Sequence, residues 1–221
     1  MISENIKSIR SHVPEQVSLV AVSKYKPISA LEEAYDAGQR MFGESKVQEM
    51  VGKYEQLPKD IAWHFIGHLQ SNKVKYMIPF VSLIHGVDSW KILLQINKEA
   101  KKINRVVDCL LQFHIAQEET KFGLSEEEVQ AFLNAEAFKE LQNVRICGVM
   151  GMASNTEDEQ QVCHEFANLK DIFLRLQQSY FSNQLAFKEI SMGMSGDYKL
   201  AIEQGSTMVR VGSAIFGVRE N

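Results

Sequence analysis

Short apolar runs alternate with segments of helical periodicity along nearly the whole chain. Eight of these runs have the length and the residue types of buried strands. They are residues 17–23 (VSLVAVS), 40–44 (RMFGE), 62–67 (AWHFIG), 82–87 (SLIHGV), 106–115 (VVDCLLQFHI), 145–152 (RICGVMGM), 188–194 (KEISMGM) and 208–213 (MVRVGS). Strands that alternate with helices pair in parallel, and parallel strands buried on both faces are continuously apolar, as these are.

Eight units of a strand followed by a helix predict a (β/α)8 barrel, also called a TIM barrel, in which the strands close into a ring inside the helices. A doubly wound open sheet is the alternative. That fold normally carries a glycine-rich phosphate loop after its first strand, whereas the first run here is followed by KYKP at residues 24–27. We favour the barrel. Because no linker rich in Pro, Gly or Ser divides the chain, we expect a single domain over residues 1–221.

The segments between the runs carry signals of helix starts and ends. Three pairs of residues fit a capping box: Ser29 with Glu32, Ser125 with Glu128, and Thr156 with Glu159. Residues 157–177 place an apolar side chain at every third or fourth position, which predicts a helix packed on the sheet. Gly38 is a natural left-handed residue after the helix that precedes it, and residues 4–13 predict an extra helix ahead of the first strand.

Composition limits the partners and the compartment. The chain has 221 residues, of which 45% are hydrophobic, so it can bury a substantial core. With 28 acidic and 24 basic residues and no long basic run, it lacks the charge pattern of a nucleic-acid-binding protein. The sequence has neither the apolar core of a signal peptide nor about 18 consecutive apolar residues. We therefore expect a cytoplasmic protein without membrane contact, and a monomer.

The cysteines and histidines do not form a metal-binding pattern. Cys109, Cys147 and Cys163 are odd in number and lack C-x-x-C spacing, and the first two lie in apolar runs, so we expect reduced cysteines. His64 and His68 have the spacing of the HEXXH zinc motif but lack its glutamate and its helix. No disulfide framework and no metal site is expected.

Polar residues follow several predicted strands, at the end where a barrel gathers its functional groups. They are Lys24, Lys26, Glu44, Ser45, His64, Ser195, Arg210, Gly212 and Ser213. Phosphate sites in barrels often lie after strands seven and eight, which here are followed by SMGMSGD (residues 191–197) and VGSAIFG (residues 211–217). Ser195, Gly212 and Ser213 would then form a phosphate cup. The alternative, of equal weight, is that the glycines are only turn residues.

Lys24 ends the first predicted strand and has three candidate roles. It is a solvated surface lysine, a partner of a substrate phosphate, or an amine that condenses with an aldehyde to give a Schiff base. The third role requires an amine partly desolvated at the barrel mouth. A phosphate cup across the mouth suits an aldehyde that carries a phosphate, such as pyridoxal 5′-phosphate (PLP), whose ring nitrogen Arg210 could contact. Pro27 turns the chain outward, so Lys26 either supplies positive charge near Lys24 or is an ordinary surface lysine.

Seven segments of the sequence resemble motifs of a known protein family. They are AVSKYKP (residues 21–27), AGQRMFGES (37–45), VQE (47–49), WHFIGHLQSNK (63–73), KFGL (121–124), SMGMSGD (191–197) and GSTMVRVGSAIFG (205–217). Together, and in this order, they resemble the YggS/PROSC family of pyridoxal phosphate homeostasis proteins over nearly the whole chain. The resemblance implies a (β/α)8 barrel of PLP fold type III, related to the cofactor domain of bacterial alanine racemases.

The same resemblance implies a role for each candidate residue. Lys24 would hold PLP as an internal aldimine, Arg210 would contact the pyridine nitrogen, and Ser195, Gly212 and Ser213 would bind the phosphate. One position departs from the family: Ser45 stands where the family usually has Asn, and a hydroxyl cannot make both hydrogen bonds of an amide. We therefore do not expect Ser45 to be a ligand. For His64, a structural hydrogen bond is a more frequent role of histidine than contact with a cofactor.

The resemblance implies no established catalytic turnover. It implies a role in holding, delivering or buffering PLP and in amino-acid and keto-acid homeostasis, with amino acids and PLP-dependent apoenzymes as further partners. An arginine at the ring nitrogen weakens PLP as an electron sink and leaves at most racemase-like proton exchange. Racemases of this type use a second domain, for which we see no room after the eighth strand. We expect a non-enzymatic PLP-binding protein; an amino-acid racemase is the first alternative, and a Schiff-base aldolase acting on a phosphorylated substrate is the second.

Overall fold

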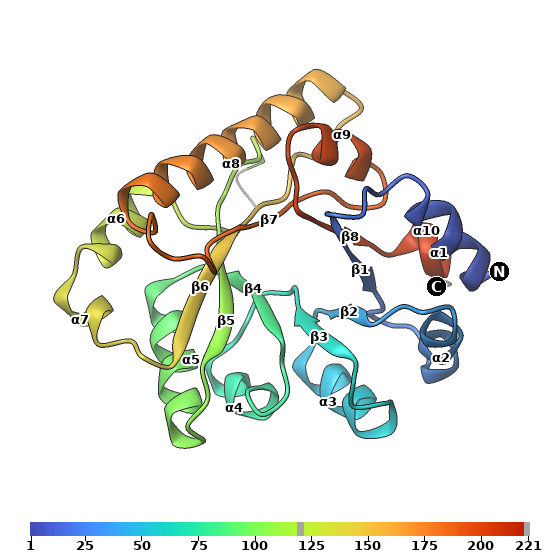
Figure 1. The fold of residues 1–221 in the computed structure, drawn as a ribbon, viewed down its shortest axis with the longest axis horizontal. Helices are drawn as coiled ribbons and strands as arrows, with labels where there is room; N and C mark the ends of the chain where they lie inside the picture. Colours follow the sequence, from blue (N-terminus) through green and yellow to red (C-terminus); the bar gives the residue numbers. More distant parts are fainter. Residues whose placement is uncertain (119–121, 219–221) are drawn as a thin grey trace.

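The eight predicted strands close into a parallel barrel in the computed structural model, which describes residues 1–118 and 122–218. The strands are β1 (Ser18–Val22), β2 (Met41–Glu44), β3 (Ala62–Phe65), β4 (Leu83–Val87), β5 (Val107–Gln112), β6 (Val144–Met150), β7 (Glu189–Ser191) and β8 (Met208–Val211). Each strand pairs with the next along the chain, and β8 pairs with β1 to close the ring (Figure 1). The barrel prediction is confirmed, and the doubly wound alternative, which requires an open sheet, is excluded.

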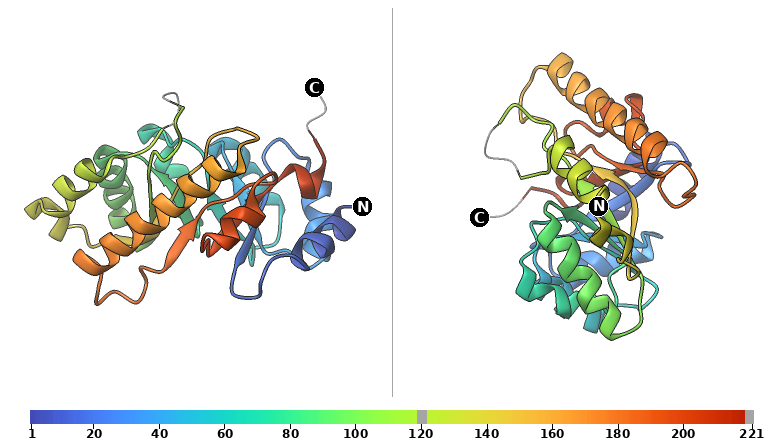
Figure 2. Two further views of the ribbon diagram at one scale, coloured as in Figure 1. Left: turned by 90° about the horizontal axis from the view of Figure 1, so that it is seen from above. Right: turned by 90° about the vertical axis from the view of Figure 1, so that its left-hand side faces the viewer.

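Helices surround this ring. They are α1 (Ile2–Arg10), α2 (Ile28–Asp36), α3 (Val47–Gln56), the 3-10 helix η1 (Ser71–Lys73), α4 (Val74–Met77), α5 (Trp90–Lys102), α6 (Glu126–Leu133), α7 (Glu136–Lys139), α8 (Glu159–Ser179), α9 (Tyr198–Glu203) and α10 (Ser213–Phe216). The predicted extra helix is α1, which packs against α2 and α10 at one side of the barrel (Figures 1 and 2). Of the described helices, none is long and apolar enough to cross a membrane.

The helix ends follow the sequence signals only in part. The capping box of Ser125 and Glu128 is confirmed at the start of α6. The other two predicted boxes are wrong, because a neighbouring residue begins each helix instead. Pro27, with its restricted φ of −68°, is the N-cap of α2. Asp158 is the N-cap of α8, where its carboxylate accepts two backbone N–H groups. Gly38 adopts the predicted left-handed conformation, with a φ of 90°.

The longest helix, α8, has the apolar stripe that the sequence predicts. Its residues Val162, Phe166, Leu169, Phe173 and Leu176 are all buried. Such side chains contribute roughly 1.5 to 3 kcal/mol each when fully buried. They belong to the large core cluster between the sheet and the surrounding helices, so α8 is held by packing on the outside of the barrel.

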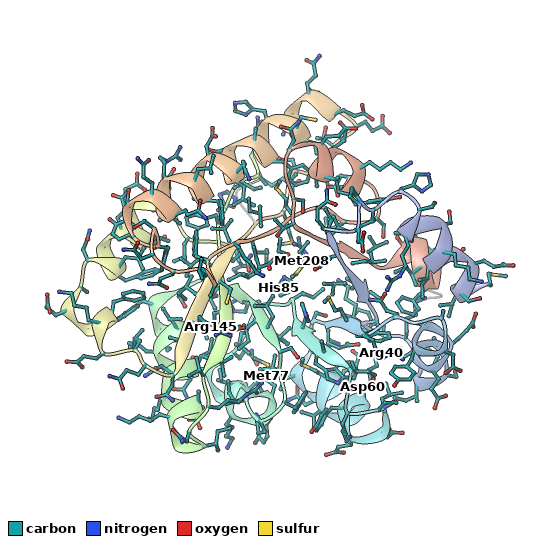
Figure 3. The ribbon with its side chains drawn as sticks, viewed as in Figure 1. Arg40, Asp60, Met77, His85, Arg145 and Met208 are labelled. Carbon is teal, nitrogen blue, oxygen red and sulfur yellow. The ribbon has the colours of Figure 1, made fainter. Side chains whose placement is uncertain are left out.

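Side chains fill the inside of the barrel in layers. Near the N-terminal ends of the strands, Arg145 donates from Nε and Nη2 to the carboxylate of Asp108 at 2.7 and 2.8 Å. The next layer is an apolar cluster of Val20, Leu83, Leu110, Cys147, Met150 and Met208. Figure 3 shows Met208 and His85 close to the middle of the barrel. His85 is fully buried and belongs to a polar layer on the C-terminal side of the apolar one.

One glycine, Gly148, gives β6 an unusual backbone conformation. Gly148 has a φ of 151°, a conformation that residues with a side chain rarely adopt, and an added Cβ would overlap the carbonyl oxygen of Glu189 on β7. We expect Gly148→Ala to lower the free energy of unfolding by about 2 kcal/mol or more. Urea unfolding followed by circular dichroism measures this.

The matched control for that substitution is Gly52→Ala. Gly52 lies inside α3 with open space around its Cα, so alanine there should raise the free energy of unfolding by up to about 1 kcal/mol. Equal effects of the two substitutions would contradict the steric role of Gly148.

Candidate functional site

The C-terminal ends of β1 and β8 lie side by side at the barrel mouth. Strand β1 ends at Val22, and Lys24 follows in a turn whose Lys26 N–H donates to the Ser23 carbonyl at 3.0 Å. On β8 the next residue is Gly212, and a Cβ added there would lie 3.3 Å from both Cβ and the carbonyl oxygen of Val22. The backbone of β8 thus approaches β1 directly below the turn that carries Lys24. Lys24 itself is exposed.

Lys26 has a structural role. Its Nζ donates to the carbonyl oxygens of Phe216 at 3.0 Å and Gly217 at 3.1 Å, at the C-terminal end of α10. The interpretation of Lys26 as an ordinary surface lysine is therefore wrong. Its ammonium ties the loop after β1 to the helix after β8, and cations are favoured at this end of a helix.

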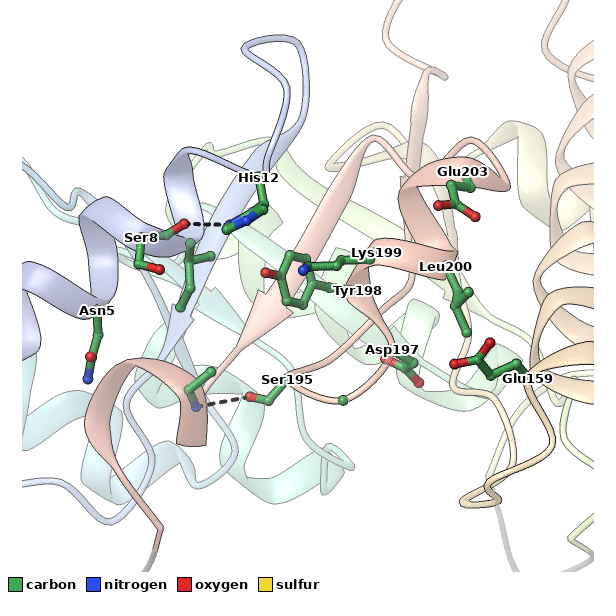
Figure 4. A pocket seen from close by; sticks show the side chains of 13 residues that line it. Asn5, Ser8, His12, Glu159, Ser195, Asp197, Tyr198, Lys199, Leu200 and Glu203 are labelled. Carbon is green, nitrogen blue, oxygen red and sulfur yellow. Dashed lines mark hydrogen bonds between the residues drawn. The ribbon is translucent and has the colours of Figure 1, made fainter.

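The segments after β7 and β8 meet at the hydroxyl of Ser195. Its Oγ accepts hydrogen bonds from the backbone N–H groups of Gly212 at 3.1 Å and Ala214 at 3.4 Å. Figure 4 shows the second of these as the dashed line at Ser195. The structure therefore brings Ser195 and Gly212 together, as the phosphate-cup hypothesis requires, and Ser213 lies exposed between the two donors. Beside this contact is a cavity of about 660 Å³ lined by residues of α1, α8, α9 and α10, but neither Lys24 nor Arg210 lines it.

A chain of buried hydrogen bonds crosses the barrel below the mouth. Arg210 donates from Nη1 to Ser191 Oγ at 2.6 Å and from Nη2 to the carbonyl oxygen of Gly151 at 3.1 Å. Ser191 Oγ lies 2.9 Å from Nδ1 of His85, and Nε2 of His85 lies 2.9 Å from Nδ1 of His64. The four side chains come from β8, β7, β4 and β3, so the chain spans the interior.

The direction of these bonds follows from Arg210. A guanidinium can only donate, so Ser191 Oγ accepts from it. The Ser191 hydroxyl then donates to Nδ1 of His85, whose own hydrogen is on Nε2 and is donated to Nδ1 of His64. His64 therefore carries its hydrogen on Nε2. In the reverse arrangement, the hydroxyl hydrogen of Ser191 would have no recorded acceptor among the described residues.

Burial sets the protonation of this layer. It lowers the pKa of His64 from 6.5 to about 4. Burial, followed by the charges of His64 and Arg210, holds the pKa of His85 well below 6.5. Burial also lowers the pKa of Arg210 to about 10, an effect that Asp197 opposes. At neutral pH both imidazoles are therefore neutral and Arg210 keeps its charge.

Sequence reasoning missed several residues of the site. In the sequence, Ser191 and His85 stand out only as parts of apolar runs. Both face inward, because His85 lies two residues along β4 from Leu83 and Ser191 pairs in register with Met150 and Met208 of the inner cluster. Glu44 was noted as polar, but not its buried partner Lys53. The signal for Lys53 was present in the sequence, since it follows Glu49 by four residues on one helix.

Comparisons with known proteins identify the family. The family described as alanine racemase, N-terminal domain, matches residues 1–220. The pyridoxal phosphate homeostasis protein of Vibrio alginolyticus is 38% identical over 234 residues, which cover 99% of this chain and 98% of that protein. This chain belongs to the pyridoxal phosphate homeostasis family. The resemblance drawn from the sequence motifs is confirmed, although one of them, KFGL, begins at Lys121, which lies outside the described residues.

Solved structures agree with this membership of the pyridoxal phosphate homeostasis family. PipY of Synechococcus elongatus is 37% identical, and the match covers 98% of this chain and 100% of PipY. Its structures without PLP and with PLP bound give TM-scores of 0.91 and 0.88. An alanine racemase from Bartonella henselae, at 19% identity and a TM-score of 0.75, shares the fold over 98% of this chain and 58% of the racemase chain.

The two buried histidines should make this homeostasis-family protein sensitive to acid. In the unfolded chain they bind protons with a pKa near 6.5, whereas in the folded chain their pKa values are depressed, to about 4 for His64. The unfolded state therefore holds more protons as pH falls below about 6.5, and the free energy of unfolding should drop by about 1.4 kcal/mol per pH unit for each histidine.

Urea unfolding at about pH 7.5 and about pH 5.5 measures this dependence. His64→Gln should remove about half of the slope that the two histidines contribute, and His12→Gln, at an exposed position, should leave it unchanged. A slope that is the same in wild type and His64→Gln would contradict the depressed pKa of His64.

Proposed function

We propose that this protein binds PLP at the mouth of the barrel and holds it, attached through Lys24, for use by other proteins. The proposal rests above all on Arg210. Its guanidinium is buried, yet its recorded partners are two neutral oxygens, those of Ser191 and Gly151, and within the described residues no carboxylate pairs with it. A buried cation in this state favours a ligand with an electron-rich acceptor, and the ring nitrogen of PLP is one.

The contacts around Ser195 support a phosphate at the other end of the ligand. Two backbone N–H groups, of Gly212 and Ala214, converge on one hydroxyl, so a phosphate oxygen near this position meets donors that already point toward it. Because these donors already bond the neutral Ser195 hydroxyl, exchanging it for a charged phosphate oxygen gains about 1 to 2 kcal/mol for each donor. Ser195, Gly212 and Ser213 are the residues that we propose as phosphate ligands.

The position of Lys24 supports covalent attachment. Its turn stands over the junction of β1 and β8, beside Gly212 and two strand positions beyond Val22. PLP supplies an aldehyde that an amine can attack and an aromatic ring that withdraws electrons from the attached group. The residues of this chain would bind the phosphate, orient the ring through Arg210 and present the amine of Lys24.

Relatives support the same ligand and its biological role. The curated relatives carry the name pyridoxal phosphate homeostasis protein, and PipY has been solved with PLP bound. We infer that this protein takes part in PLP and amino-acid/keto-acid homeostasis, with amino acids and PLP-dependent apoenzymes as the partners to which bound PLP would pass.

We further propose that the protein has no catalytic turnover of its own. His64 is the histidine best situated to act as a second base, because it stands at the end of β3. Because Nδ1 of His64 accepts from His85, its Nε2 carries the hydrogen. Its pKa of about 4 also makes His64 a weak base. An arginine at the ring nitrogen would also leave that nitrogen unprotonated and weaken the ring as an electron sink.

Lys24 should carry PLP in the purified protein. Reduction with borohydride should fix a pyridoxyl group on the peptide that contains Lys24, as found by mass spectrometry after proteolysis. Lys24→Ala should lose the visible absorption of the attached cofactor yet retain PLP through its phosphate, at about 1 to 2 kcal/mol for each backbone donor. Lys26→Ala is the control and should still be labelled at Lys24. A label on Lys26 alone, or a colourless protein with PLP added, would overturn the assignment.

Amino acids should not be turned over at enzymatic rates. We expect a panel of L- and D-amino acids to show at most slow deuterium exchange at Cα, because His64, the candidate second base, has a pKa of about 4 and is a weak base. Free PLP and Lys24→Ala serve as controls. Exchange of one amino acid at roughly 1 s⁻¹ or faster would establish racemase-like catalysis and would exclude a purely non-enzymatic role.

A further inference from the structure

A buried cluster of charges lies beneath the turn that carries Lys24. Its centre is Lys53 of α3, whose side chain is only 6% exposed. The Nζ atom of Lys53 donates to the carbonyl oxygen of Ser23 at 2.8 Å, to Oε1 of Glu44 at 2.8 Å and to Oε1 of Glu49 at 2.7 Å. An ammonium has three hydrogens, so this one is fully used.

The cluster holds both peptide groups that flank Lys24. The peptide before it is held by its carbonyl, which belongs to Ser23 and accepts from Lys53. The peptide after it is held by its N–H, which belongs to Tyr25 and donates to Oε1 of Glu49 at 2.5 Å. Ser23 is fixed a second time, because its hydroxyl donates to Oε1 of Glu44 at 2.6 Å. The backbone of Lys24 is thus tied on both sides, while its side chain remains exposed.

Stability alone does not account for this arrangement. The Glu44 side chain is fully buried, and one of its oxygens has no hydrogen-bond partner among the described residues. Burial raises the pKa of its carboxyl, although Lys53 opposes this. Buried ion pairs of this kind recover only part of the cost of removing charges from water. In addition, Tyr25 has a φ of 64°, a left-handed conformation that is unfavourable for a residue with a Cβ.

We propose that Lys53, Glu44 and Glu49 position the amine of Lys24, by fixing the backbone of the turn from Ser23 to Tyr25 in the conformation from which Lys24 reaches the PLP aldehyde. The inference rests on the proposed function, since it assigns a purpose to the turn only if Lys24 is the point of attachment. Lys53 and the two glutamates touch no ligand in this proposal, so they are positioning residues.

The test compares variants of the intact chain with PLP as the probe. Glu49→Ala removes the acceptor of the Tyr25 N–H, and Lys53→Met removes the donor to Ser23. Both should slow covalent attachment of PLP, measured by stopped-flow absorbance, on the order of ten- to a hundredfold. Total PLP bound to the cup, measured by equilibrium dialysis at saturating PLP, should stay within about threefold of wild type because the phosphate contacts are untouched.

Two further variants separate positioning from a general loss of stability. Glu49→Gln keeps a carbonyl oxygen for the Tyr25 N–H and should restore attachment to within about threefold of wild type. Lys102→Met removes another lysine–glutamate pair within one helix, formed with Glu99 on α5 by a lysine that is exposed, and should leave the rate unchanged. An independent readout is hydrogen exchange of the Tyr25 amide in protein without PLP, which should lose protection in Glu49→Ala and keep it in Glu49→Gln.

The possible outcomes separate the positioning role from the proposed function. If wild type is labelled at Lys24 and Glu49→Ala attaches PLP at the wild-type rate, the positioning role is overturned while the proposed function stands. Equal slowing in Glu49→Gln and Glu49→Ala, or in Lys102→Met, also overturns it. If wild type does not attach PLP to Lys24, the proposed function fails and the inference fails with it. Should Lys53→Met not fold, the two Glu49 variants decide alone, because Glu49 is partly exposed.

Discussion

The pairing of β8 with β1 is the constraint on which the candidate site depends. Ser18 to Ala21 pair in register with Met208 to Val211, which puts Arg210 beside Val20 and brings Gly212 against Val22. Residues from the two ends of the chain therefore become neighbours only when the ring closes. Contacts outside the sheet strengthen the same junction, since Asn5 of α1 donates to the carbonyl oxygen of Ile215 at 2.8 Å. A change that separates β8 from β1 would move Lys24 away from Arg210 and Gly212.

The buried polar layer imposes a second requirement. A buried donor or acceptor left without a partner costs about 1 to 3 kcal/mol, so every member of the layer depends on its neighbours. Ser191 is the junction, because it must accept from Arg210 and donate to His85, and a hydroxyl does both through a single atom. The single direction of these bonds explains how two neutral histidines and a buried arginine satisfy one another inside the barrel.

The sequence predicts the scaffold better than the site. The eight strands and the stripe of α8 follow from periodicity, which the chain expresses locally. The bonds of Lys26 to α10 and of Lys53 to Ser23 join segments that the sequence separates, so no local pattern reveals them. Helix starts are predicted less well than the strands and better than the long-range bonds. Asp158 replaces Thr156 as the cap of α8, because several nearby residues can serve as caps and the tertiary structure selects one of them. The strand-end rule did find Lys24, Arg210 and Gly212, because a barrel converts strand order into spatial proximity.

The hydroxyl of Ser195 affects how tightly the proposed site would hold a phosphate. It already accepts from the N–H groups of Gly212 and Ala214, so a phosphate arriving there exchanges one acceptor for another instead of meeting unpaired donors. The free energy gained is then the difference between a charged and a neutral hydrogen bond, about 1 to 2 kcal/mol for each donor. When the phosphate leaves, the serine can re-form its bonds and lower the barrier to departure. In the proposed site, this exchange of acceptors favours a short residence of the phosphate over permanent binding.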